Sequence, residues 1–402
     1  ILVVLLLALT GAAASLPEAL SGFSSPVAYF LIGVLTIGIA VEKVGLAGRL
    51  ARFFLRRAGG AHGPLYWQMI LSFPLLTFLM PSATTRSGIL IHIYDRALAL
   101  GGIRKGAPPD RAIMMALGSI NRLASTAVLT GGITPIVGAA LIGGIGWGRW
   151  FVLLALPYYL LLAAGAGGNY LWYMRGEGGR TPFPDDRAPP LSAPEVRVAA
   201  IVLAASALWL TDGIHGLHPA LPALLSWAAL LAPGVGVLSW REFESRFAWS
   251  NFFVLASSLS LGHALINTGA AQWLALRLME AVPAISSEPI FLFAGILLAS
   301  VPVRFLVPNI AGFLAIAIPI GMEMGRAGGL NPVVCGLGVM IMGDTVLFYP
   351  AQSASSLVVF ERGELSAGEI LRFGLFMTCV AFAVTMTFTL WWWNGVGLEW
   401  RG

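Results

Sequence analysis

Three arginines and one aspartate stand inside long apolar stretches of this 402-residue sequence. They are Arg86, Arg122, Arg304 and Asp344. An ionisable side chain at membrane depth is costly, so each is expected to have a function and a partner. A guanidinium group binds a carboxylate or a sulfate through two parallel N–H groups, so three of them predict a site for small anions. The alternative is structural: each arginine could pair with an acid or with backbone carbonyl groups.

Asp344 is the only acid deep in its apolar stretch. Two roles are open for it. It could neutralise Arg122 or Arg304 in a structural ion pair, or it could take part in proton coupling.

Small polar residues and prolines interrupt four apolar stretches, two in each half of the chain: 65–93, 112–142, 289–322 and 333–360. Irregular backbone at membrane depth is tolerated only where protein or a water-filled cavity satisfies its polar groups. The first and third stretches suit hairpins of two half-helices. We therefore expect residues near 82–86, 130–136, 309–312 and 352–356 to converge in one cavity near the membrane midplane.

The candidate substrate-binding residues come from these breaks and from the buried arginines. They are Ser82, Ala83, Thr84, Thr85, Arg86, Arg122, Thr134, Pro135, Arg304, Asn309, Ile310, Gln352, Ser353, Ser355 and Ser356. Further polar residues that could line the same site are Asn121, Ser125, Thr126 and Thr130.

The composition is that of an integral membrane protein with several spans. Hydrophobic residues make up 57% of the chain and charged residues only 11%, against about 25% charged in soluble domains. Apolar runs of about 20 residues, long enough to cross ~30 Å of hydrocarbon, recur throughout. The net charge of +5 fits arginine-rich cytoplasmic loops better than a nucleic-acid partner. The five histidines and two cysteines show no metal-ligand spacing, and no nucleophile–base pair suggests an enzyme.

An internal repeat divides the chain. The segment that begins at Gly38 recurs 224 residues later at Gly262 with six of 14 positions identical, and residues 78–81 match residues 305–308. We predict a first repeat at 1–173, a cytoplasmic linker at 174–197, a second repeat at 198–393 and an external C-terminal tail at 394–402. Nothing in the first repeat matches the helix at 198–210, so at least one N-terminal helix is expected to be missing from it.

Charge predicts that the two repeats are inverted. Of the Lys and Arg residues outside the apolar stretches, sixteen fall on the side of the linker and four on the other, with Lys43 expected at the membrane interface. By the positive-inside rule the linker is cytoplasmic. The first hairpin then enters from the cytoplasm and the second from outside.

The whole chain resembles the divalent anion/sodium symporter family, which carries dicarboxylates, citrate and sulfate. The most specific match is the segment 249–274, which is similar to the family's Trp-led, glycine-rich helix that ends in a Thr-Gly pair, here Thr268-Gly269. The family's Ser-Asn-Thr hairpin tips read Ser82-Ala83-Thr84 and Asn309-Ile310-Ala311 here. Its Thr-Pro turns read Thr134-Pro135-Ile136-Val137 and Ser353-Ala354-Ser355-Ser356.

The resemblance implies an elevator-type movement, a homodimer and sodium ions held by oxygens of the tips and turns. Here Ser82, Thr84 and Thr134 are the oxygens that remain for sodium, and no other cofactor is expected. Because the second half has lost such oxygens and Arg86 would repel a cation, we expect transport to depend only weakly on sodium.

The sequence thus predicts a secondary active transporter of a small multivalent anion, such as a di- or tricarboxylate or sulfate, in a bacterial inner membrane. Its partners would be the anion, the lipid bilayer and a second copy of the chain, with no nucleic acid. Arg86→Ala is expected to weaken anion binding more than Arg304→Ala. Two alternatives stay open: a transporter-derived subunit that no longer transports, and a carrier of a non-anionic solute.

Overall fold

The computed structural model describes residues 1–80, 82–179, 190–281, 288–362 and 364–402. All named elements in these ranges are helices, so the predicted all-α polytopic fold is confirmed. Seven helical segments in them are long and apolar enough to cross a membrane: Pro26–Val44, Trp147–Tyr173, Ala193–Leu210, Trp249–Asn267, Pro289–Leu306, Ile310–Ala327 and Ala367–Gly395. Pro81 and residues 180–189 of the expected linker lie outside the described residues.

Elements follow one another in the same order in both halves: a span, an amphipathic helix, a hairpin, a broken helix and a long helix. In the first half these are α3 (Pro26–Val44), α4 (Leu46–Arg57), α5 (His62–Leu79) with α6 (Ala83–Leu100), then α7 (Pro108–Met115), η1 (Ala116–Ile120), α8 (Asn121–Thr126), η2 (Leu129–Gly131) and α9 (Ile133–Ile142), and finally α10 (Trp147–Tyr173). In the second half they are α15 (Trp249–Asn267), α16 (Ala270–Ala281), α17 (Pro289–Leu306) with α18 (Ile310–Ala327), then α19 (Pro332–Thr345), η4 (Pro350–Gln352) and α20 (Ala354–Phe360), and finally α21 (Ala367–Val384) with η5 (Thr385–Thr389) and α22 (Leu390–Gly395).

Proline explains where each hairpin turns. Met80 and Val307, which follow α5 and α17, both precede a proline in the sequence and have non-helical backbone angles. The returning helices then begin with polar caps: Ser82 accepts a hydrogen bond from the backbone N–H of Thr85, and Asn309 accepts one from Gly312. Local sequence thus sets both hairpin tips.

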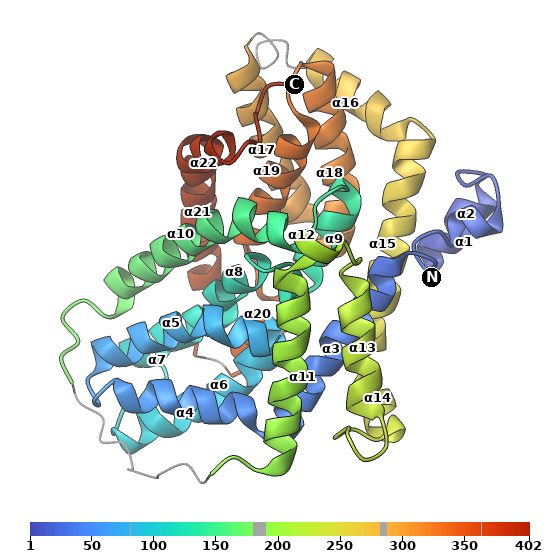
Figure 1. Cartoon of the computed structure of the whole chain (residues 1–402). Helices are drawn as coiled ribbons and strands as arrows, with labels where there is room; N and C mark the ends of the chain where they lie inside the picture. The colour runs from blue at the N-terminus through green and yellow to red at the C-terminus, as the bar shows by residue number, and fades with distance from the viewer. Residues whose placement is uncertain (81, 180–189, 282–287, 363) are drawn as a thin grey trace.

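The helices pack in two groups. The scaffold group is α3 and α15 with α11 (Ala193–Leu210) and α13 (Ala220–Leu231), in which α3 packs against α11, α13 and α15. The hairpin group is α5, α6, α17 and α18 with the broken helices, in which α18 packs on α17 and α19 while α20 packs on α6 and η1. The first hairpin lies at the lower left of Figure 1 and the second at the top, with α8 and α20 between them. The two groups meet where α15 contacts α18 and α9.

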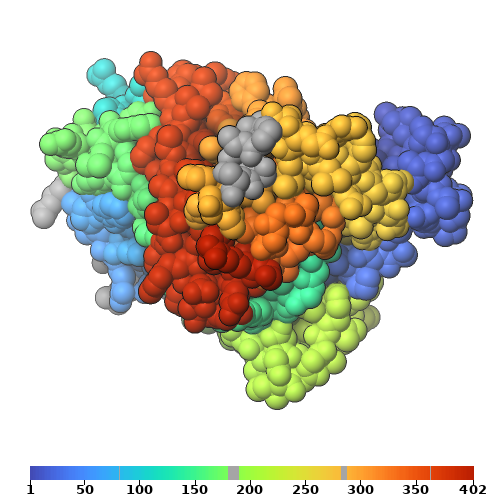
Figure 2. All heavy atoms as spheres, turned by 90° about the horizontal axis from the view of Figure 1, so that it is seen from above, coloured from blue at the N-terminus to red at the C-terminus, as the bar shows by residue number. Residues whose placement is uncertain are grey.

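The N-terminal residues form a small lobe of their own. Helices α1 (Leu2–Leu9) and α2 (Leu16–Ala19) share a minor core with Ala264 of α15. Figure 2 shows this segment (blue) projecting at the edge of the molecule. The main core, by contrast, extends through both helix groups.

Candidate functional site: a cavity between the hairpin tips

The four breaks meet in one cavity of about 270 Å³, as the sequence predicts. This central cavity is lined by Leu35, Ser82, Ala83, Thr84, Arg122, Ser125, Thr126, Gly131, Gly132, Ile133, Thr134, Pro135, Asn251, Asn309, Ile310, Asp344, Ala351, Gln352, Ser353, Ala354 and Ser355. Pockets for drug-sized ligands measure about 300–1,000 Å³, so this one suits a small solute.

Four helices begin at the wall of the central cavity. The N-cap residues of α6, α9, α18 and α20 are Ser82, Gly132, Asn309 and Ser353, and all four line it. A helix N-terminus carries partial positive charge and unpaired N–H groups, which favour an anion. At Gly132 and Ser353 no side chain caps the first turn, so those N–H groups remain open to a ligand.

Arg122 supplies a full positive charge to the same wall. Its Nε donates to the backbone oxygen of Ser119 at 3.2 Å, and its Nη1 lies 3.8 Å from an oxygen of Asp344. Its Nη2 is buried and has no hydrogen-bond partner among the described residues. Arg122 also lines the central cavity, and its contact with an anion stays a prediction.

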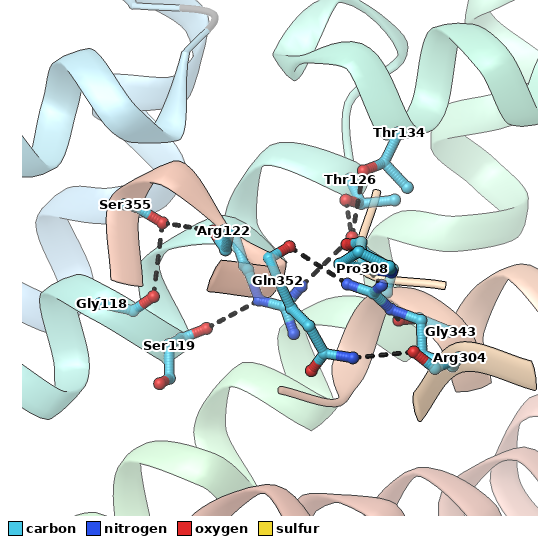
Figure 3. A network of polar contacts seen from close by, with 12 residues as sticks. Gly118, Ser119, Arg122, Thr126, Thr134, Arg304, Pro308, Gly343, Gln352 and Ser355 are labelled. Atoms are coloured by element: carbon cyan, nitrogen blue, oxygen red, sulfur yellow. Dashed lines mark hydrogen bonds and ion pairs between the residues drawn. The ribbon is translucent and has the colours of Figure 1, made fainter. Parts of the chain in front are cut away.

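Asp344 is held mainly by hydroxyl groups. Thr126 donates to one carboxylate oxygen at 2.7 Å and Thr134 to the other at 3.1 Å. Figure 3 shows the Thr126 and Thr134 hydroxyls close together, with Arg122 on the other side of the network. The ion pair between Asp344 and Arg122 is one of the two roles expected for this acid.

The two charges occupy matching places in the two broken helices. Arg122 lies seven residues before the start of η2, and Asp344 lies six residues before the start of η4. One half of the chain therefore provides the cation and the other half provides its counter-ion.

Arg86 is not on the cavity wall, and the expectation that it contacts substrate needs correction. Its guanidinium is fully buried and donates to the Met80 oxygen, to the side-chain and backbone oxygens of Asn121, and to Ser125 Oγ, at 2.7–3.0 Å. Met80 ends α5, where backbone carbonyls lack helical partners and carry partial negative charge. Arg86 thus connects the first hairpin tip to the first broken helix. Its role is structural, which is the alternative to substrate contact that the sequence left open.

Arg304 does the same in the second half. It donates to the backbone oxygens of Val307 and Pro308 at the end of α17, of Gly343 in the last turn of α19, and of Gln352. Figure 3 shows it directed at Pro308, Gly343 and Gln352. It too is fully buried and absent from the cavity wall, so the substrate contact expected for it is corrected in the same way.

Some of the remaining candidate residues line the central cavity and others do not. Thr85 and Ser356 do not line the central cavity, whereas Ser125 and Thr126 do. Sequence reasoning missed Asn251 of α15 and Leu35 of α3. Both come from the scaffold group, and neither stands at a break in the apolar pattern, so no local signal marks them.

The oxygens expected to hold sodium are partly engaged. Ser82 Oγ accepts two hydrogen bonds from Thr85, and Thr134 donates to Asp344. The third, Thr84, lines the central cavity together with the Arg122 guanidinium.

Two hairpins and two broken helices around a polar cavity, in a chain of apolar spans, define a membrane transporter. The chain belongs to the family described as the sodium:sulfate symporter transmembrane region, whose model matches residues 1–398. This is the divalent anion/sodium symporter family that the sequence resembles. Membership places the chain among integral membrane transporters and not among enzymes.

The named relatives have low sequence identity to this chain, but each match covers most of both chains. A "Membrane protein" of Cupriavidus necator is 24% identical over 96% of this chain and 78% of its own. The L-tartrate/succinate antiporter of Escherichia coli K12 is 23% identical over 94% of this chain and 81% of its own. The crystal structure of the Alcanivorax borkumensis YdaH transporter shares the fold with a TM-score of 0.61 at 16% identity, over 95% of this chain and 88% of that one.

Proposed function

We propose that this protein is a secondary active transporter of a small multivalent anion, such as a dicarboxylate or sulfate, that binds at Arg122 in the central cavity. Arg122 carries the proposal, because it is a guanidinium on the wall of the central cavity and its buried Nη2 has no hydrogen-bond partner among the described residues, an arrangement that favours an oxyanion nearby. The uncapped N-termini of α9 and α20 add donors to the same space. The L-tartrate/succinate antiporters among the relatives suggest dicarboxylates as the first substrates to test.

We further propose that transport is elevator-like and depends weakly on sodium. Most of the cavity wall belongs to the hairpin group, so a substrate could move with that group against the scaffold group. The opposite membrane orientations predicted for the two repeats would let the cavity face either side in turn. As to sodium, Ser82 and Thr134 already have hydrogen-bond partners, and the Arg122 charge opposes a nearby cation. We also propose a homodimer, and only the resemblance to the family supports it.

The test is anion uptake into proteoliposomes by the purified protein. We expect uptake of labelled tartrate, succinate or sulfate, with less than a tenfold difference in affinity between sodium and choline buffers. Arg122→Gln should weaken affinity about 10- to 150-fold, since a charge-assisted hydrogen bond contributes about 1.5–3 kcal/mol. The matched control is Arg277→Gln, which removes an exposed arginine paired with Glu280.

A second variant separates binding from stability. Arg122→Gln leaves Asp344 buried without its cation, which by itself destabilises a fold. The double variant Arg122→Gln/Asp344→Asn removes both charges and should recover thermal stability while affinity stays low. Full anion affinity in the double variant would show that Arg122 is not the anion ligand.

A further inference from the structure

Helix α4 carries four arginines and no acidic residue, and none of its residues lines the central cavity. Arg49 is paired with Glu195 of α11 at 2.9 Å. Arg52, Arg56 and Arg57 follow within the next two turns, and none of the three has a carboxylate partner among the described residues. Three neighbouring cations without counter-ions form a surface that fits an anionic partner.

The position of α4 along the chain places it at a membrane surface. Helix α3 is long and apolar enough to cross a membrane, and it ends at Val44 because Gly45 takes a left-handed backbone conformation with φ of 81°. Helix α4 begins at the next residue, so no loop separates it from the end of the span. Its ion pair with Glu195 places it on the side of the linker, which the positive-inside rule predicts to be cytoplasmic.

The two sides of α4 differ in what they contact. Ala47 and Ala51 are buried, and the helix packs on α5 and α6 of the first hairpin. Figure 1 shows α4 below α5 at the lower left of the molecule. Phe53 is 49% exposed, and the Arg57 guanidinium lies over its ring, 4.9 Å from the centroid. Arginines beside an exposed aromatic ring suit a membrane interface, where phosphate groups meet acyl chains.

We propose that α4 is a binding surface for the headgroups of anionic phospholipids. Arg52, Arg56 and Arg57 bind the phosphate oxygens, which match the fork of a guanidinium group, and Phe53 contacts the acyl chains. A basic residue near an anionic lipid surface strengthens binding about fivefold. The inference concerns the membrane and not the transported solute, so it does not depend on the proposed function.

Other amphipathic helices of the chain lack this unbalanced charge. Helix α16 holds the place of α4 in the second half, between a span and a hairpin, and its one basic residue, Arg277, is paired with Glu280 at 2.8 Å. Helix α14 (Trp240–Arg246) carries two arginines and two glutamates. The anionic partner is therefore assigned to α4 and not to amphipathic helices in general.

The experiment compares two lipids that share their acyl chains and differ in headgroup charge. The purified chain in a non-ionic detergent at low salt is titrated with dioleoyl phosphatidylglycerol and dioleoyl phosphatidylcholine, and native mass spectrometry counts the lipids bound. We expect a preference for phosphatidylglycerol on the order of a hundredfold, at about fivefold per arginine. The preference should shrink as ammonium acetate is raised, because salt screens exposed charges. Free glycerol phosphate at the same concentration should not compete.

Variants locate the lipid on α4. The triple variant Arg52→Gln/Arg56→Gln/Arg57→Gln should bind phosphatidylglycerol no better than phosphatidylcholine. The matched control is Arg241→Gln/Arg246→Gln/Arg277→Gln, which removes three exposed arginines elsewhere and should keep the preference. Because both variants lose the same net charge, a difference between them reports on the site.

Four results would overturn the inference. Equal binding of the two lipids by the wild-type chain would do so whether or not any variant folds. An unchanged preference in the α4 variant, or an equal loss in the control, would place the lipid elsewhere. Competition by free glycerol phosphate would make the surface a site for soluble phosphates. A dimer in lipid-free detergent that the α4 variant loses, with lipid binding unchanged, would assign α4 to a contact between copies.

Discussion

At the residue scale, the three buried arginines differ in how many of their donors are occupied. A guanidinium has five N–H donors in a rigid fork. Arg86 and Arg304 direct theirs at carbonyl oxygens where a half-helix ends, and these oxygens carry partial negative charge. Arg122 bonds one carbonyl oxygen and keeps a donor free beside the cavity. Arg86 and Arg304 are therefore positioning residues, and Arg122 is the candidate ligand.

We predict that Arg86→Ala and Arg304→Ala destabilise the protein to a similar extent, by at least ~3 kcal/mol each. Each change leaves several buried carbonyl oxygens without a donor, at about 1–3 kcal/mol per unsatisfied group. Thermal unfolding in detergent, followed by size-exclusion chromatography, measures this, with Arg277→Ala as the exposed control.

The lysine variants sharpen this prediction. Arg86→Lys and Arg304→Lys keep the charge but lose the fork, and should recover only part of the stability. If Arg86→Ala kept its stability and lost only anion affinity, Arg86 would be a ligand after all.

At the element scale, the breaks in the helices depend on close backbone contacts as well as on proline. In the first broken helix, η2 folds back on the end of α8. A Cβ atom at Gly131 would lie 1.9 Å from the backbone oxygen of Ser125, and a backbone atom cannot move aside as a side-chain tip can. Because Gly131 and Ser125 both line the central cavity, the shape of the break is also the shape of the site.

We expect Gly131→Ala to displace the break and to reduce anion affinity at least tenfold, with a lower unfolding temperature. The matched control is Gly88→Ala on α6, where an added Cβ meets no atom within 4 Å. An alanine in a helix interior is favoured over glycine by about 0.5–1 kcal/mol, so the control should be as stable as wild type or slightly more so. The measurements are anion-binding isotherms and thermal unfolding curves of the two variants. Equal anion affinity and equal unfolding temperature in both variants would contradict the role given to Gly131.

At the scale of the whole molecule, the two helix groups meet along α15, which packs on α18 and α9. A Cβ atom at Gly262 of α15 would lie 3.9 Å from the Cα of Ala315 on α18, so the two Cα atoms are within the range that a disulfide spans. It would also lie 2.5 Å from the Cδ2 atom of Leu141, a side-chain end that has to shift. If the hairpin group moves against the scaffold group, this contact must slide in every transport cycle.

We predict that the double variant Gly262→Cys/Ala315→Cys, in a background with Cys335 and Cys379 replaced by alanine, loses transport on oxidation and recovers it on reduction. The control pair is Gly321→Cys/Val339→Cys, which joins α18 to α19 inside the hairpin group with Cβ atoms 3.9 Å apart. Counterflow of labelled tartrate before and after oxidation is the measurement. Undiminished transport by the oxidised first pair would rule out sliding at this interface.

The sequence by itself determined the membrane class, the family and the positions of the four breaks. Apolar length, a proline and an N-cap residue act within one or two turns, so they can be read without knowledge of distant contacts. Most candidates at the breaks, from Ser82 to Ser355, therefore do line the central cavity.

Only the tertiary structure decided which buried arginine is open to a ligand. Arg86, Arg122 and Arg304 look alike in the sequence, because each is a single cation in apolar surroundings. The partners that distinguish them come from distant parts of the chain: Arg86 donates to Asn121, 35 residues away, and Arg122 pairs with Asp344 of the other half. A buried charge is defined by the groups that compensate it, and the fold alone brings those groups within reach.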